Sequence, residues 1–167
     1  MTTKILRSCR PSAEEGSALV ELALSLPVLL LILLGAAEFA RCAYAAIEVV
    51  NAAHAAAIYA ASSAAASGDS GGITNAATAD AGNLFGSNAI SVTSVTPSCT
   101  CANTAYTPSS CSDNQTCYSH NTAMVTAITV QTQATYHPLI VANVGGLAGI
   151  PSQFTMTGQS TQVVSNQ

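Results

Sequence analysis

The sequence predicts an α+β fold, in which a long N-terminal helix with its first part in a membrane precedes a small disulfide-bonded antiparallel β domain. Three observations support this prediction. Residues 22–37 are uncharged and almost wholly apolar, residues 122–136 alternate between apolar and polar side chains, and four cysteines fall within a short loop. With 167 residues, the chain has room for one modest domain besides an anchor.

The first element is a membrane helix that follows a basic leader, residues 1–16. Residues 22–37 would span about 24 Å as a helix, and including residues 17–20 brings the length to about 30 Å, enough to cross a bilayer. Three basic residues lie in the first ten positions, and none follows Arg41. Because positive charge is retained in the cytoplasm, we expect a single-pass inner-membrane protein with a cytoplasmic N-terminus and a periplasmic or extracellular C-terminal domain.

A secretory signal peptide is the alternative interpretation of this segment. Its apolar core would be residues 22–34, and the small residues at 35–37 would offer a cleavage site. Two observations weigh against it: acidic residues at positions 14, 15 and 21 separate the basic leader from the apolar core, and the helical pattern continues beyond position 37. With such an ordinary signal sequence, the chain would be a secreted or membrane-anchored, disulfide-bonded binding protein, and cleavage would release the secreted form.

We expect one continuous helix over residues 17–66, lying in the membrane up to about residue 40. Alanine, the strongest helix former, supplies 13 of the 24 residues at 43–66. Pro27 is expected to kink this helix. Small side chains on its distal half would let other helices approach closely, which favours helix packing between subunits. The sequence Ser-Gly-Asp-Ser-Gly-Gly at 67–72 is expected to end it.

A Gly/Ser-rich linker with a short helix is expected over residues 67–87, and an exported β-rich domain over residues 88–167. The short helix would occupy residues 74–85. We expect strands at residues 90–96, 122–136 and 154–164. One face of the second strand would carry Met124, Ile128, Val130 and Tyr136.

Four cysteines, Cys99, Cys101, Cys111 and Cys117, lie in a loop rich in Pro, Ser, Thr and Asn. In an exported domain such a group indicates two disulfides, for which three connectivities exist. A bond between Cys99 and Cys101 is the least favourable because it closes a strained ring, which leaves two connectivities. A zinc site is the alternative, but the C-x-C-x9-C-x5-C spacing lacks the usual C-x2-C knuckle. We therefore expect two disulfides in the loop 99–117 and no metal.

No pattern in the chain indicates catalysis. The three histidines, His54, His120 and His137, are far apart, and the sequence contains no G-x-S-x-G, H-E-x-x-H or phosphate-binding glycine loop. The lack of basic residues after Arg41 excludes an exported nucleic-acid-binding face. We expect no enzymatic activity, no cofactor and no nucleic-acid partner.

Gly16, Ser17 and Glu21 form the most informative motif. A carboxylate in an apolar helix costs about 2.5 to 3.5 kcal/mol at a bilayer centre and less near the surface, so a compensating partner is expected. The order of leader, glycine, four residues, glutamate and apolar helix resembles a type IV prepilin N-terminus. This resemblance implies cleavage between Gly16 and Ser17 on the cytoplasmic side, and pairing of Glu21 with the new N-terminal amine of an adjacent subunit. An ordinary signal anchor with a snorkelling Glu21 is the alternative.

Residues 15–61 resemble the start of TadE-like pseudopilins. Two segments carry the resemblance: Glu-Gly-Ser-Ala-Leu-Val-Glu-Leu-Ala-Leu-Ser-Leu-Pro at 15–27, and Asn-Ala-Ala-His-Ala-Ala-Ala-Ile-Tyr-Ala at 51–60. Leu22, where major Flp pilins have tyrosine, and the large exported domain favour a pseudopilin over a major subunit.

The resemblance implies a pilin-like fold and a minor pilin-like component of the tight-adherence (Flp) pilus system, a type IV pilus. Such a protein would act in pilus assembly and adhesion at the bacterial cell surface, with incorporation in the pilus. Its partners would be a prepilin peptidase, other pilin or pseudopilin subunits and the pilus assembly machinery.

Overall fold

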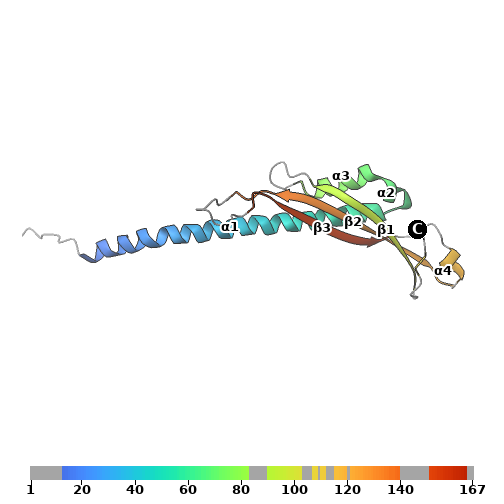
Figure 1. The fold of residues 1–167 in the computed structure, drawn as a ribbon, viewed down its shortest axis with the longest axis horizontal. Helices are drawn as coiled ribbons and strands as arrows, with labels where there is room; N and C mark the ends of the chain where they lie inside the picture. The colour runs from blue at the N-terminus through green and yellow to red at the C-terminus, as the bar shows by residue number, and fades with distance from the viewer. Residues whose placement is uncertain are drawn as a thin grey trace, which may run out of the picture. The chain divides into compact units, whose positions relative to one another are not determined.

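The computed structural model describes residues 13–82, 90–102, 107–108, 110–111, 115–119, 121–139 and 151–164. They divide into two compact units, Met1–Ala40 and Arg41–Gln167, and helix α1 (Ala13–Ala61) contributes to both. The other elements, in chain order, are α2 (Ala64–Gly68), α3 (Ser70–Asp80), β1 (Ser91–Cys101), α4 (Gln115–Ser119), β2 (Met124–Tyr136) and β3 (Phe154–Val163) (Figure 1). This architecture confirms the predicted α+β class, with a long apolar helix before a small antiparallel sheet.

Helix α1 begins at Ala13, four residues before the predicted start at Ser17. It continues through Pro27, which has no backbone N–H to donate to the preceding turn. The basic residues of the predicted leader, in residues 1–12, lie outside the described part of the chain, as does His120.

The distal end of α1 differs from the prediction, because the helix ends at Ala61 and not at Ala66. The Ser62 hydroxyl donates to the Tyr59 carbonyl at 2.7 Å. Ser63 is extended, and its side chain accepts the Ala66 N–H at 3.1 Å as the N-cap of α2. Serine side chains compete for backbone groups in this way, so two serines interrupt a run of strong helix formers.

The predicted breaker at 67–72 contains the end of α2 and the start of α3. Asp69 is the N-cap of α3: its carboxylate accepts the Gly72 N–H at 3.0 Å and the Tyr59 hydroxyl at 2.7 Å. The hydrogen bond from the Gly72 N–H is the main cause that lowers the pKa of Asp69, and the hydrogen bond from the Tyr59 hydroxyl lowers it further. Helix α3 therefore begins at Ser70 and not at the predicted Thr74. An aspartate N-cap stabilises the first turn of the helix even though that turn contains two glycines.

The three strands form one antiparallel sheet in the order β1-β2-β3. Val130 of β2 pairs with Val95 on one side and with Ser160 on the other. The predicted alternation in β2 is correct, since Ile128, Val130 and Tyr136 are all buried. Strand β1 continues beyond its predicted end at residue 96, through Pro97, to Cys101.

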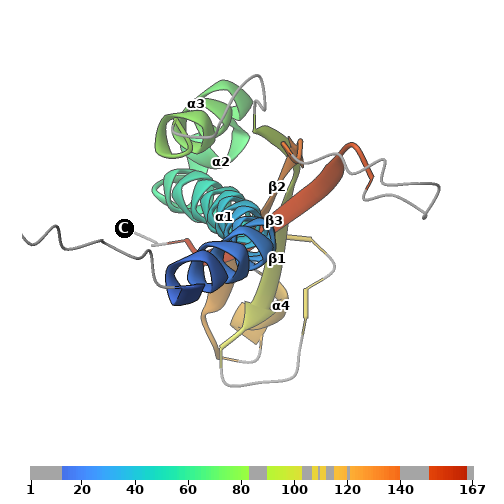
Figure 2. The ribbon, with the colours of Figure 1, turned by 90° about the vertical axis from the view of Figure 1, so that its left-hand side faces the viewer.

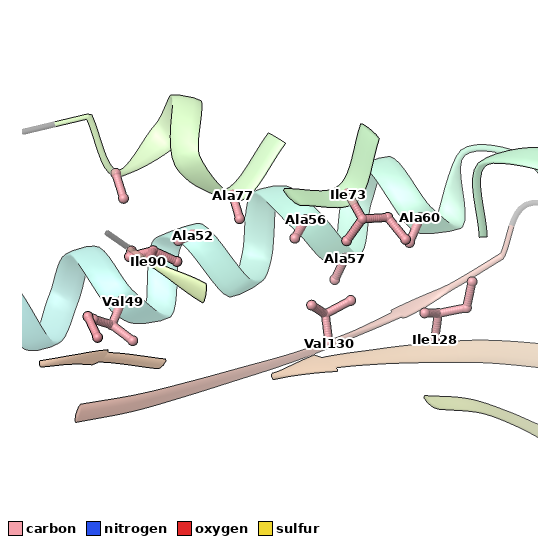
Figure 3. Packing of buried hydrophobic residues seen from close by; sticks show 12 residues of the cluster. Val49, Ala52, Ala56, Ala57, Ala60, Ile73, Ala77, Ile90, Ile128 and Val130 are labelled. Carbon is pink, nitrogen blue, oxygen red and sulfur yellow. The ribbon is translucent and has the colours of Figure 1, made fainter. Parts of the chain in front are cut away.

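The core lies between α1, α3 and the sheet (Figure 3). Alanines cover much of the buried side of α1, so neighbouring elements approach it closely. On one side of α1 lie Ile73 and Ala77 of α3, and on the other lie Ile128 and Val130 of β2. Figure 2 shows α1 between α3 and the strands when viewed along its axis.

A close contact between α1 and the sheet occurs at Val49. The fully buried Thr132 donates its hydroxyl to the Val49 carbonyl at 2.7 Å. A Cβ at Gly158 would lie 2.7 Å from the Val49 carbonyl carbon and 2.9 Å from Thr132 Oγ1, closer than real side chains pack. Only glycine therefore fits at position 158 without a shift of the backbone.

Candidate functional site

The first part of α1 presents an apolar surface on all sides. Every side chain described from Gly16 to Ala37 is exposed. Helix α1 is long and apolar enough over Gly16–Ala61 to cross a membrane. The most apolar stretch of this helix is not buried by the rest of the chain. Since a helix that is apolar all round requires apolar surroundings, this segment has the properties of a membrane anchor.

Gly16 lies in the first turn of α1, before Ser17. A Cβ placed on Gly16 would meet nothing within 4 Å, so packing inside this chain does not require a glycine there. Glycine inside a helix is less stable than alanine by about 0.5 to 1 kcal/mol. Packing among the residues that the structure describes therefore gives no reason for a glycine at position 16.

Glu21 lies one turn after Ser17, and both side chains are exposed. Residues four apart share a face of a helix, so the predicted cleavage site and the predicted assembly residue lie on one side of α1. Within the part of the chain that the structure describes, no ion pair to Glu21 is formed. Compensation of its charge in a membrane would have to come from another group, such as a neighbouring subunit.

The cysteine loop contains two disulfides, Cys99–Cys111 and Cys101–Cys117, with Cα–Cα distances of 5.4 and 5.2 Å. This is one of the two connectivities that the sequence leaves open. The second bond is buried and ties α4 to the end of β1. Among the described residues, no group of three or more His, Cys, Asp or Glu side chains could hold a metal ion.

His54 and Arg41 join the distal part of α1 to the sheet. His54 Nδ1 lies 3.3 Å from Ser160 Oγ and 3.2 Å from Gln162 Nε2, both on β3. The Arg41 guanidinium lies 5.8 Å from the centre of the Tyr136 ring, a distance at which a cation attracts an aromatic face. Sequence reasoning did not find these contacts, because nothing local pairs residues that are about a hundred positions apart.

An open cavity of about 230 Å³ lies between α3 and β1. Its lining is aliphatic and hydroxylic, and consists of Ser70, Ile73, Thr74, Val92, Thr93, Ser94 and Val95. It contains no charged or nucleophilic pair that would indicate chemistry.

The described residues thus combine an apolar, exposed helix, long enough to cross a membrane, with a small disulfide-bonded α+β domain. Residues 16–57 match the family described as TadE-like protein, which confirms the resemblance seen in the sequence. The match covers a segment of α1 and does not extend to the sheet domain. No curated protein and no solved structure matches the chain.

Proposed function

We propose that this chain is a pseudopilin of a tight-adherence (Flp) pilus, cut by a prepilin peptidase and packed into the assembly through its N-terminal helix. The observation that carries the proposal is that the family match begins at Gly16, the glycine of the expected cleavage site, and continues along α1. The open space around Gly16 supports it, because a peptidase that selects glycine explains what packing does not.

The proposed orientation places residues 1–16 in the cytoplasm and the sheet domain outside the inner membrane. The basic leader favours this orientation through the positive-inside rule. The two disulfides favour it too, because such bonds persist in the periplasm and outside the cell and are rare in the cytoplasm.

Cleavage would place a new cationic amine on Ser17, at the N-terminus of α1. Helix N-termini favour negative charge, so this amine requires an anionic partner. The carboxylate of Glu21 in an adjacent subunit would neutralise it and would fix the axial position of one helix against the next. In poorly solvated surroundings such a pair attracts more strongly than at a surface, although desolvation offsets much of the gain.

The cleavage is tested by Gly16→Leu, with Gly35→Leu as its matched control. Both glycines lie on α1, and a Cβ added at either position would meet nothing within 4 Å, so either leucine fits the fold. We expect Gly16→Leu to block processing and Gly35→Leu to leave it unchanged, measured by the intact mass of the protein from membranes. A mature chain that begins near Glu38 would instead favour the secreted binding protein, and an uncut wild-type chain would exclude peptidase processing.

The assembly role is tested by Glu21→Gln, with Glu48→Gln further along the same helix as the control. We expect Glu21→Gln to leave membrane insertion and the disulfides intact but to reduce co-purification with pilus components and the number of pili by at least tenfold. Glu48→Gln should assemble like the wild type. Normal pili with Glu21→Gln would show that the carboxylate is a tolerated interfacial residue. A loss of inserted protein would show that the carboxylate acts in insertion and not in assembly.

A further inference from the structure

The two outer strands of the sheet have different free edges. In β1, every second residue directs its N–H and C=O groups away from β2. Pro97 is one of these residues, and it has no N–H to offer to another strand. The pairing shifts between Val92 and Ser94, and Cys99 bonds to Cys111. A proline, a bulge and a covalent link are features that prevent an edge from pairing with another strand.

Among the residues that the structure describes, no strand pairs with the outer edge of β3, and this edge has none of these features. The Val164 N–H donates to the Thr126 carbonyl at 2.8 Å, which sets the alternation of hydrogen bonds along the β2–β3 pair. The residues between those bonded to β2 direct their N–H and C=O groups outward: Thr155, Thr157, Gln159, Thr161 and Val163. Strand β3 contains no proline and no charged residue, and its pairing with β2 has no register shift.

An exposed apolar stripe of α1 lies beside this edge. His54 contacts Ser160 and Gln162, so its side of α1 overlies β3. Ile47, Val50 and Ile58 share that side of the helix through their three- and four-residue spacings, and are 57%, 46% and 52% exposed. Large apolar side chains gathered next to an unpaired edge indicate a contact surface.

We propose that the β3 edge pairs antiparallel with β3 of a second copy of this chain, around a two-fold axis at Gln159. The outward residues read Thr-Thr-Gln-Thr-Val, which is nearly symmetric about Gln159 because threonine and valine have the same shape. Self-pairing places Thr157 opposite Thr161 of the second copy, and Gln159 opposite Gln159. The same kinds of pair already occur between β2 and β3, at Thr129–Thr161 (2.8 Å) and Gln131–Gln159 (3.4 Å).

The absence of charge on β3 removes electrostatic repulsion between two copies, and the pairing also brings two α1 stripes together. Within Arg41–Gln167, α1 runs parallel to β3, since Val49 lies by Gly158 and His54 by Ser160 and Gln162. Antiparallel pairing therefore joins copies whose α1 helices run in opposite directions. The experiments below therefore bring together copies that are anchored in two separate membranes.

Cysteine cross-linking tests the pairing and its direction. Full-length Thr157→Cys and Thr161→Cys, each in a background with Cys9→Ala and Cys42→Ala, are reconstituted in separate liposomes, then mixed and mildly oxidised. Opposed residues of a hydrogen-bonded antiparallel pair lie about 5.5 Å apart, within reach of a disulfide. We expect a covalent dimer from the mixture but none from either variant alone.

Thr135→Cys, on the same sheet face but in the central strand, is the control and should form no dimer. Cross-linking of like with like would show parallel pairing and overturn the proposal. The absence of a dimer in every sample would overturn it too. This test does not depend on peptidase processing, so it can fail while the proposed function holds.

Liposome clustering tests the edge itself. In Gln159→Pro the missing N–H is one that points away from β2, so the sheet should be retained while the edge is blocked. Gln159→Lys blocks it by charge, and Gln131→Lys places the same charge one strand inward as the control. We expect both Gln159 variants to cluster at the level of protein-free liposomes and Gln131→Lys to cluster like the wild type. Unchanged clustering with Gln159→Lys would overturn the proposal.

Discussion

Single residues hold α1 against the sheet through backbone contacts. Thr132 is a fully buried polar residue, and burial without a partner would leave its hydroxyl unsatisfied. The Val49 carbonyl supplies that partner. Because Gly158 faces the same carbonyl, a threonine and a glycine together fix where α1 crosses the strands.

We predict that Thr132→Val lowers the free energy of unfolding by about 0.5 to 1.5 kcal/mol, since it removes one hydrogen bond at nearly constant volume. Thr129→Val, on the outer face of the same strand, should change it by less than about 0.5 kcal/mol. Urea unfolding of the full chain in detergent measures both. Equal effects would mean that the contact with Val49 contributes no more than the half-buried Thr129 does.

Asp69 makes the stability of the helix corner depend on pH. Its pKa is lowered from 3.8 in the folded protein, first by the Gly72 N–H and then by the Tyr59 hydroxyl. The stabilisation is therefore complete above 3.8 and is lost as the pH falls through the lower, folded-state pKa. We predict a smaller fall of Tm below about pH 4 in Asp69→Asn than in the wild type.

Tyr59→Phe removes only the second hydrogen-bond donor, and should give an intermediate dependence of Tm on pH. Thermal unfolding of the full chain in detergent between neutral and acidic pH compares the three proteins. If the Tm of Asp69→Asn falls at acidic pH as steeply as that of the wild type, the pH dependence comes from other carboxyl groups.

At the scale of elements, the disulfides hold a segment that has little other structure. Helix α4 has only five residues, and the buried Cys101–Cys117 bond attaches it to β1. A short helix is marginal in water without such support. The other bond, Cys99–Cys111, links β1 to the loop that follows it.

We predict that the double variant Cys101→Ser/Cys117→Ser loses more stability than Cys99→Ser/Cys111→Ser. Each disulfide is expected to contribute about 2 to 4 kcal/mol, and the first pair also leaves two hydroxyls in a buried place. Urea unfolding measures the difference, and non-reducing mass analysis of peptic peptides checks the connectivity. Peptides that link Cys99 to Cys117 would contradict the pairing described above.

The strands were more predictable than the helix ends. The alternation in β2 gives its buried face directly, because one face of this sheet is solvated. The interruption of α1 at Ser62 and Ser63 was not predicted, since alanines on both sides favour a helix and the competing bonds come from two serine hydroxyls. Because glycines surround Asp69, the sequence predicts that this segment only ends a helix. In the structure, the Asp69 carboxylate also caps the start of α3.

For the whole molecule, the sequence predicts the fold class and the N-terminal motif because both rest on local patterns. An uncharged apolar run and a glycine followed by glutamate can be recognised in one segment of chain. The Thr132–Val49 contact spans 83 positions, and no local pattern pairs these residues. The free β3 edge was equally invisible, because it depends on which strand lies outermost in the sheet.

The contact between Arg41 and Tyr136 also determines how the protein meets a protease. No lysine or arginine follows Arg41, so trypsin has no site beyond it in the chain. That site lies inside α1, with its guanidinium over the Tyr136 ring. A helical peptide bond is cut only after local opening. The rate of tryptic cleavage after Arg41 would therefore report how often α1 opens there, and motions in the loops of the sheet domain would not affect it.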